Sequence, residues 1–104
     1  MSKRLEMFDK LLAAGSKDPF HHYARALELR SLARGTEALA ALAQVTRDFP
    51  DYVPSYLIAA QLASELPDLQ AAQDFCDRGV LAAERAGNEH ALAELRELRG
   101  SLAG

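Results

Sequence analysis

The side chains that could bind a metal or act as a nucleophile are few in this sequence, and their spacing does not suit joint chemistry. His21 and His22 are neighbours, so on a helix they would point about 100° apart and could not bind one metal ion. Cys76 is the only cysteine, which excludes an internal disulfide and a cysteine-based metal site. We expect a packed thiol at this position and no metal site.

Acidic side chains are more numerous, but they alternate with arginines on faces that the apolar residues leave free. The clearest examples are Glu28, Glu37, Asp74, Asp77, Glu84, Glu94 and Glu97. The sequence contains no glycine-rich phosphate loop, no serine elbow and no histidine and glutamate pair at metal spacing. The carboxylates therefore indicate a solvated exterior, and we predict a protein without a cofactor or an enzymatic activity.

Length and charge restrict the possible partners further. A chain of 104 residues can bury one core but has no room for a separate catalytic module. Its net charge of -3, with both signs interspersed, offers no dense positive field for nucleic acid or for an anionic membrane. The chain also lacks an apolar run long enough for a signal peptide or a membrane span. These features predict a cytoplasmic protein that binds neither nucleic acid nor a membrane.

Six helical segments would position these side chains. Leucine and alanine dominate the apolar residues, and they recur at the three- and four-residue spacing of amphipathic helices. The expected helices cover 2–14, 18–33, 36–49, 54–66, 68–86 and 88–103. We expect Asp18, Asp68 and Asn88 to cap helix starts, whereas Gly35 and Thr36 should break and recap the chain.

The second and third segments resemble the fourth and fifth when the chain is shifted by 34 residues. This shift aligns Ala26 with Ala60, Leu32 with Leu66, and Ala38 with Ala72. The chain resembles the tetratricopeptide repeat (TPR) family over 18–86, and its small bacterial-type members in particular, through the motifs at 23–27, 37–39, 49–51 and 56–60. It departs from the family pattern at Arg25, at Pro67-Asp68, and where the second repeat lacks its terminal proline.

The resemblance implies an all-α fold in which antiparallel helix-turn-helix repeats stack as a short right-handed solenoid. Within one domain, 1–104, it places two TPR units at 19–50 and 53–86, an N-terminal helix in 1–16 and a C-terminal capping helix at 88–103. A single helix pair cannot bury both its faces, so the flanking helices should cover the ends of the stack.

The resemblance also implies a groove, lined by the first helix of each repeat, that binds a peptide or a partner helix. The residues at the lining positions are Phe20, Tyr23, Leu27, Arg30, Ser31, Pro54, Leu57, Gln61, Ser64 and Glu65. The lysine and asparagine clamp that grips acidic chaperone tails in this family is missing, because its positions carry Tyr23, Leu27, Leu57 and Gln61.

We therefore predict an adaptor for a protein or peptide partner. Two alternatives stay open. A terminal helix could fill the groove, or the chain could be a self-assembling unit whose terminal helices form a homodimer that buries Leu95 and Leu98.

Overall fold

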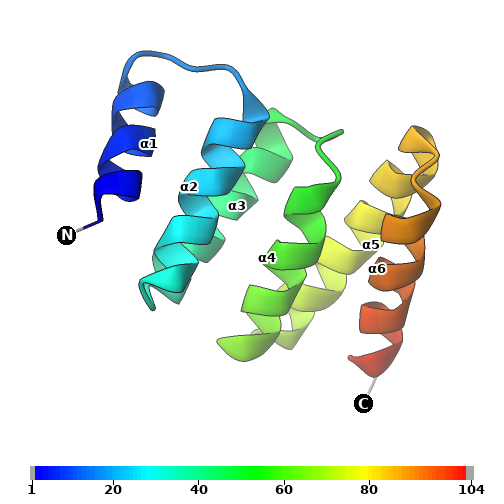
Figure 1. The fold of residues 1–104 in the computed structure, drawn as a ribbon. Helices are drawn as coiled ribbons and strands as arrows, with labels where there is room; N and C mark the ends of the chain where they lie inside the picture. The colour runs from blue at the N-terminus through cyan, green and yellow to red at the C-terminus, as the bar shows by residue number, and fades with distance from the viewer. Residues whose placement is uncertain (1, 103–104) are drawn as a thin grey trace.

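Six α-helices make up the computed structural model, which describes residues 2–102 (Figure 1). They are α1 (Lys3–Ala13), α2 (Pro19–Ser31), α3 (Gly35–Asp48), α4 (Pro54–Glu65), α5 (Leu69–Ala86) and α6 (Glu89–Ser101). No strand occurs within these described residues, so the predicted all-α class is confirmed.

Short polar side chains begin four of the helices. Asp18 accepts a hydrogen bond from the Phe20 amide, Asp68 from the Ala71 amide and Asn88 from the Ala91 amide. Ser2 caps α1 in the same way. These bonds satisfy amides that have no partner inside a helix, so the start of each helix is encoded locally, as the sequence predicts for Asp18, Asp68 and Asn88.

The turn between α2 and α3 differs from the expectation. The residue that takes the left-handed conformation is Ala33, with φ of 60°, and Gly35 is instead the first residue of α3. Thr36 lies inside the helix and does not cap it, since Arg34 holds the capping position without a side-chain bond. Alanine rarely adopts the left-handed conformation because its Cβ atom makes it sterically costly, so the residue type at position 33 does not indicate this turn.

The helices form consecutive antiparallel pairs that stack side by side. The pair α2 and α3 packs against the pair α4 and α5 through α3 and α4, and α6 packs against α5 and α4. In Figure 1, α2, α4 and α6 form a front layer, with α3 and α5 behind it. α1 packs against α2 at the other end of the stack. This is an all-α helical repeat, as predicted.

The 34-residue shift is visible in the packing. Ala26 and Ala60 are both fully buried, and so are Ala38 and Ala72. Leu42 and Cys76, which the shift also aligns, are fully buried as well. Equivalent positions therefore meet equivalent environments, which is what stacked copies of one helical hairpin require.

Gly79 of α5 lies where this helix closely approaches both α4 and α6. A Cβ atom at this position would lie 2.6 Å from the Cβ of Tyr56 and 3.0 Å from a Leu95 methyl carbon. Only glycine lets α5 approach α4 and α6 this closely. The Tyr56 side chain is also held in place, because its hydroxyl donates a 2.6 Å hydrogen bond to the Pro50 carbonyl. This contact joins α6 firmly to the second repeat.

Candidate functional site

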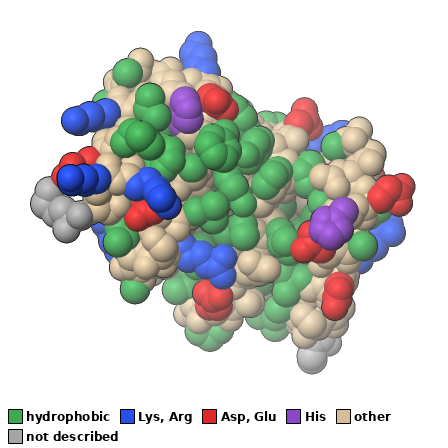
Figure 2. Space-filling model, in the orientation of Figure 1, with side chains coloured by type: hydrophobic (Ala, Val, Ile, Leu, Met, Phe, Trp, Pro, Cys, Tyr) green, Lys and Arg blue, Asp and Glu red, His purple; other side chains and the backbone are tan. Residues whose placement is uncertain are grey.

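The face formed by α2, α4 and α6, hereafter the α2/α4/α6 face, carries most of the residues predicted to bind a partner. Figure 2 shows hydrophobic side chains gathered over the middle of this face, with charged side chains around them. Tyr23 of α2, Leu57 of α4 and Leu98 of α6 are only partly buried. The face therefore combines an apolar centre with a polar edge.

Two adjoining cavities lie between α4 and α6 on this face. The first, of about 220 Å³, has Tyr23, Pro54, Leu57 and Ile58 on one side and His90, Ala91 and Glu94 of α6 on the other. The second, of about 250 Å³, is lined by Leu57, Gln61, Glu94, Glu97, Leu98 and Ser101. Leu57 and Glu94 belong to both cavities, so we call the two together the α4/α6 slot.

Tyr23 forms the wall of the slot on the α2 side. Its ring lies edge-on to the ring of Tyr52, with centroids 5.5 Å apart. Burial raises the pKa of the Tyr23 hydroxyl, and the positive charge of Arg30 partly opposes this shift. The phenol is therefore neutral at physiological pH and able to donate a hydrogen bond to a ligand.

Arg30 and Glu65, which the sequence placed at the polar edges of the groove, contact each other. The Arg30 guanidinium donates a hydrogen bond to Glu65 across 3.2 Å, joining α2 to α4. Each charge is thus compensated by the other rather than left for a ligand. The pair closes one end of the gap between the first helices of the two repeats.

Phe20 and Leu27 lie apart from the slot. They line a different cavity, of about 370 Å³, together with Arg4 and Phe8 of α1 and Glu28 of α2. Phe20 is 53% exposed, whereas Leu27 is half-buried. The predicted groove residues therefore line two cavities, with Tyr23 and Leu57 beside α6, and Phe20 and Leu27 beside α1.

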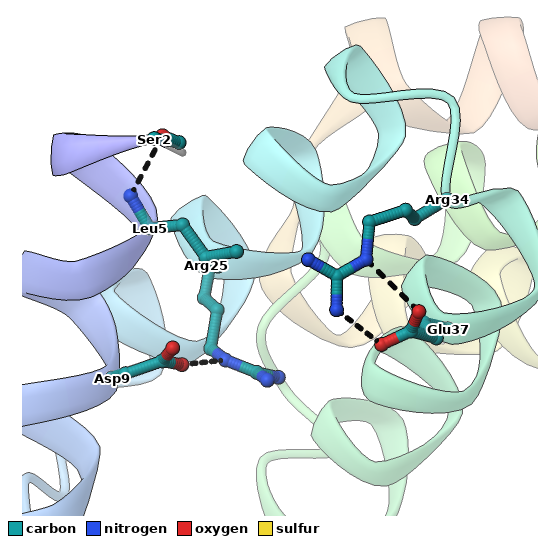
Figure 3. Close-up of polar contacts among 6 residues, drawn as sticks. All are labelled: Ser2, Leu5, Asp9, Arg25, Arg34 and Glu37. Carbon is teal, nitrogen blue, oxygen red and sulfur yellow. Dashed lines mark hydrogen bonds and ion pairs between the residues drawn. The ribbon is translucent and has the colours of Figure 1, made fainter.

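Polar contacts attach α1 to α2. The Arg25 side chain donates a 2.6 Å hydrogen bond to the Asp9 carboxylate, which explains the polar residue at a position where the repeat usually has an apolar one (Figure 3). The Ser2 hydroxyl donates to Glu28, and Arg4 lies 3.7 Å from the same carboxylate. A further cavity of about 430 Å³ lies on the other side of α1, between Leu5, Asp9, Leu32 and Arg34.

Two acidic residues of α6, which the sequence pattern assigned to the solvated exterior, line the slot. Glu94 and Glu97 line the slot because α6 packs beside α4 and α5 at the C-terminal end of the stack. The spacing of the helix starts could have indicated this position for α6, because α2, α4 and α6 begin at equal intervals, at 19, 54 and 89.

The two histidines and the cysteine that could have bound a metal or acted as a nucleophile have structural contacts instead. The His21 ring is hydrogen-bonded to the Ser16 hydroxyl at 2.7 Å, and the His22 ring to the Ser16 carbonyl at 2.9 Å. The Cys76 thiol is fully buried and its pKa is raised by desolvation, as expected. Within residues 2–102, no group of three or more histidine, cysteine or acidic side chains is placed to hold a metal ion. None of the described helices combines the length and apolar character needed to cross a bilayer.

The likeness of this chain to known proteins is found among solved structures. No protein-family model matches the sequence, and no curated protein matches it either. Among solved structures, a TPR domain protein from Salinibacter ruber is 30% identical, with a TM-score of 0.80 over 84% of this chain and 98% of the other. The chain therefore belongs to the tetratricopeptide repeat family.

Two more distant structures share the fold. The TPR2B domain of yeast Sti1, solved in a complex with pHsp70, is 17% identical, with a TM-score of 0.85 over 95% of this chain and 79% of that domain. A protein from Bordetella parapertussis is 19% identical, with a TM-score of 0.81 over 99% of this chain and 90% of the other. At these identities the likeness concerns the fold alone.

Proposed function

We propose that this protein is a non-catalytic interaction module that binds a peptide or a partner helix on the α2/α4/α6 face. The observation that carries the proposal is the α4/α6 slot, in which half-buried Leu57 separates two cavities. An apolar floor with a phenol and polar side chains at its edge suits an apolar anchor residue whose backbone makes polar contacts.

Family membership supports the same proposal. The related Sti1 domain was solved with pHsp70, so a stack of this shape can hold a protein ligand. We assign 19–50 and 53–86 as the two repeats, with Tyr23, Leu57 and Gln61 as the main contact residues of this chain. Phe20 and Leu27 would contact a longer ligand that continues towards α1, while Arg30 and Glu65 hold the two repeats together.

Dimerisation through α6 has less support. Leu95, one of the two leucines expected in such an interface, is fully buried within the chain between α4 and α5. It cannot contact a second copy unless the helices separate. We therefore propose the adaptor alone.

A peptide-display selection tests the adaptor. A randomised library of displayed peptides is selected against the intact protein, and the enriched peptides are synthesised and measured by fluorescence anisotropy. Leu57→Asp should weaken their binding at least about tenfold, because a carboxylate in the slot would lose its hydration when an apolar anchor covers it.

Leu81→Asp is the matched control, because Leu81 is exposed on α5 and lines no part of the slot. Circular dichroism must show that both variants stay helical. Equal affinity for the wild type and a folded Leu57→Asp variant, or a selection that enriches nothing, would contradict the proposed function.

A further inference from the structure

Within the described part of the chain, the carboxylates that line the α4/α6 slot have no lysine or arginine beside them in its lining. Its two cavities are lined by Glu94 and Glu97, and among the described residues no lysine or arginine lines either of them. Glu94 is near His90, whose ring nitrogen lies 3.1 Å from the carboxylate, and Glu97 has no ion-pair partner within 2–102. The edge of the slot is therefore acidic, whereas its floor is apolar.

The basic residues of α6 cannot compensate this edge. On a helix, residues three and four apart share a face, so His90, Glu94, Glu97 and Ser101 lie together. Arg96 is one residue from Glu97 and two from Glu94, so it does not share their face. Arg99 lies on another face, where it donates a 2.9 Å hydrogen bond to Asp77 of α5. Arg30 of α2, whose charge acts on Tyr23, is paired with Glu65. No cation of the described chain is placed to neutralise Glu97.

The cavity between α1 and α2 has no comparable imbalance. Arg4 lies beside Glu28 there, and that carboxylate also accepts a hydrogen bond from Ser2. The two halves of the face thus differ: the half towards α1 is internally neutralised, and the half towards α6 presents carboxylates to solvent. A ligand that lies along the face would meet negative charge at the α6 end only.

We propose that the occupant of the α4/α6 slot is a peptide segment of another protein that carries apolar side chains next to lysine or arginine. The apolar side chains pack on Leu57 and Leu98, and the cations contact Glu94 and Glu97. Charge of the opposite sign at the edge speeds association and excludes acidic partners. This proposal rests on the proposed function and adds the chemical class of the ligand.

The peptides enriched in the same display selection are used to test this proposal, and their net charge is the first quantity compared. The enriched peptides should carry a net positive charge, with lysine or arginine beside leucine-sized residues. Glu94→Gln/Glu97→Gln should weaken the best synthetic peptide about tenfold, since two partly exposed ion pairs are removed. Raising NaCl from about 50 to about 500 mM should weaken it similarly, and this salt effect should shrink in the double variant.

Glu84→Gln/Glu89→Gln is the matched control, because it removes two exposed carboxylates that do not line the slot. It should leave the affinity unchanged. If the control weakens binding as much as Glu94→Gln/Glu97→Gln does, only net charge matters and the proposal is overturned.

The other outcomes separate this proposal from the proposed function. Enrichment of neutral or acidic peptides that Leu57→Asp still disrupts would refute the basic ligand and keep the groove. Basic peptides that bind wild type and the Glu94→Gln/Glu97→Gln variant equally would also refute it. A selection in which Leu57→Asp has no effect would contradict both.

Discussion

The two ends of the helical stack are attached in different ways. α6 inserts Leu95, which is fully buried, into a cluster with Val53, Tyr56 and two alanines of α5. α1 contributes Leu5 and Phe8 to a narrow seam with α2, and cavities of about 430 and 370 Å³ lie on its two sides. Both segments cover an end of the repeats, yet only α6 places a fully buried leucine between two other helices. Close packing therefore fixes α6 against the second repeat, whereas α1 packs chiefly against α2 and should be held more weakly.

Among substitutions that compare the two ends of the stack, Leu95→Ala should lower the free energy of unfolding the most. Removing a fully buried leucine side chain leaves a cavity and costs about 2–5 kcal/mol of the free energy of unfolding. Urea denaturation followed by circular dichroism measures this loss. A cost below about 1 kcal/mol would mean that α6 is not an integral part of the core.

Phe8→Ala should cost less, about 1–2 kcal/mol, although a buried phenylalanine usually costs about 3–5 kcal/mol. The reason is that α1 packs chiefly against α2, so the helix can detach while the repeats stay folded. Hydrogen exchange should show protection lost over 3–13 and retained over α4 and α5. Loss of protection in every helix at once would show that α1 belongs to the same cooperative unit as α6.

Gly79→Ala tests the close approach at the α6 end. The new methyl group would overlap Tyr56 and Leu95, at a cost of about 1–3 kcal/mol, against a gain of up to about 1 kcal/mol in helix propensity. We expect a net destabilisation of about 1 kcal/mol in thermal or urea unfolding.

Gly100→Ala is the matched control for that substitution. No atom lies within 4 Å of a Cβ built at Gly100, so the same change should stabilise the protein by up to about 1 kcal/mol. Effects of the same sign at the two glycines would argue against tight packing between α5 and α6.

Asp9→Asn should have the smallest effect, below about 1 kcal/mol, because its ion pair with Arg25 is partly exposed to solvent. Amides of α1 should nevertheless exchange faster in this variant. Asp74→Asn, which removes a pair inside α5, should leave α1 unchanged. Equal exchange of α1 in the wild type and in Asp9→Asn would show that this ion pair does not help to hold α1.

The sequence predicted the features that depend on local chemistry. Capping by Asp18, Asp68 and Asn88 follows from each residue and its neighbours, and the 34-residue shift placed Ala26 and Ala60 in equivalent environments. The left-handed Ala33 was missed, because alanine has no preference for that conformation.

The division of the predicted groove was also missed, since it depends on where the terminal helices pack. Phe20 faces α1 and Leu57 faces α6 because of contacts between residues far apart in the sequence. No local pattern encodes such contacts. Glu94 and Glu97 line the slot only because α6 packs beside α4.

Chemical-shift mapping of a bound peptide tests the central claim most directly. The intact ¹⁵N-labelled protein is titrated with the tightest selected peptide, and the amide shifts are followed residue by residue. We predict the largest shifts at Tyr23, Leu57, Gln61, Glu94 and Glu97, with little change at Leu81 on the far side of α5. Shifts concentrated around Leu81, or at α1 alone, would contradict a binding site between α4 and α6.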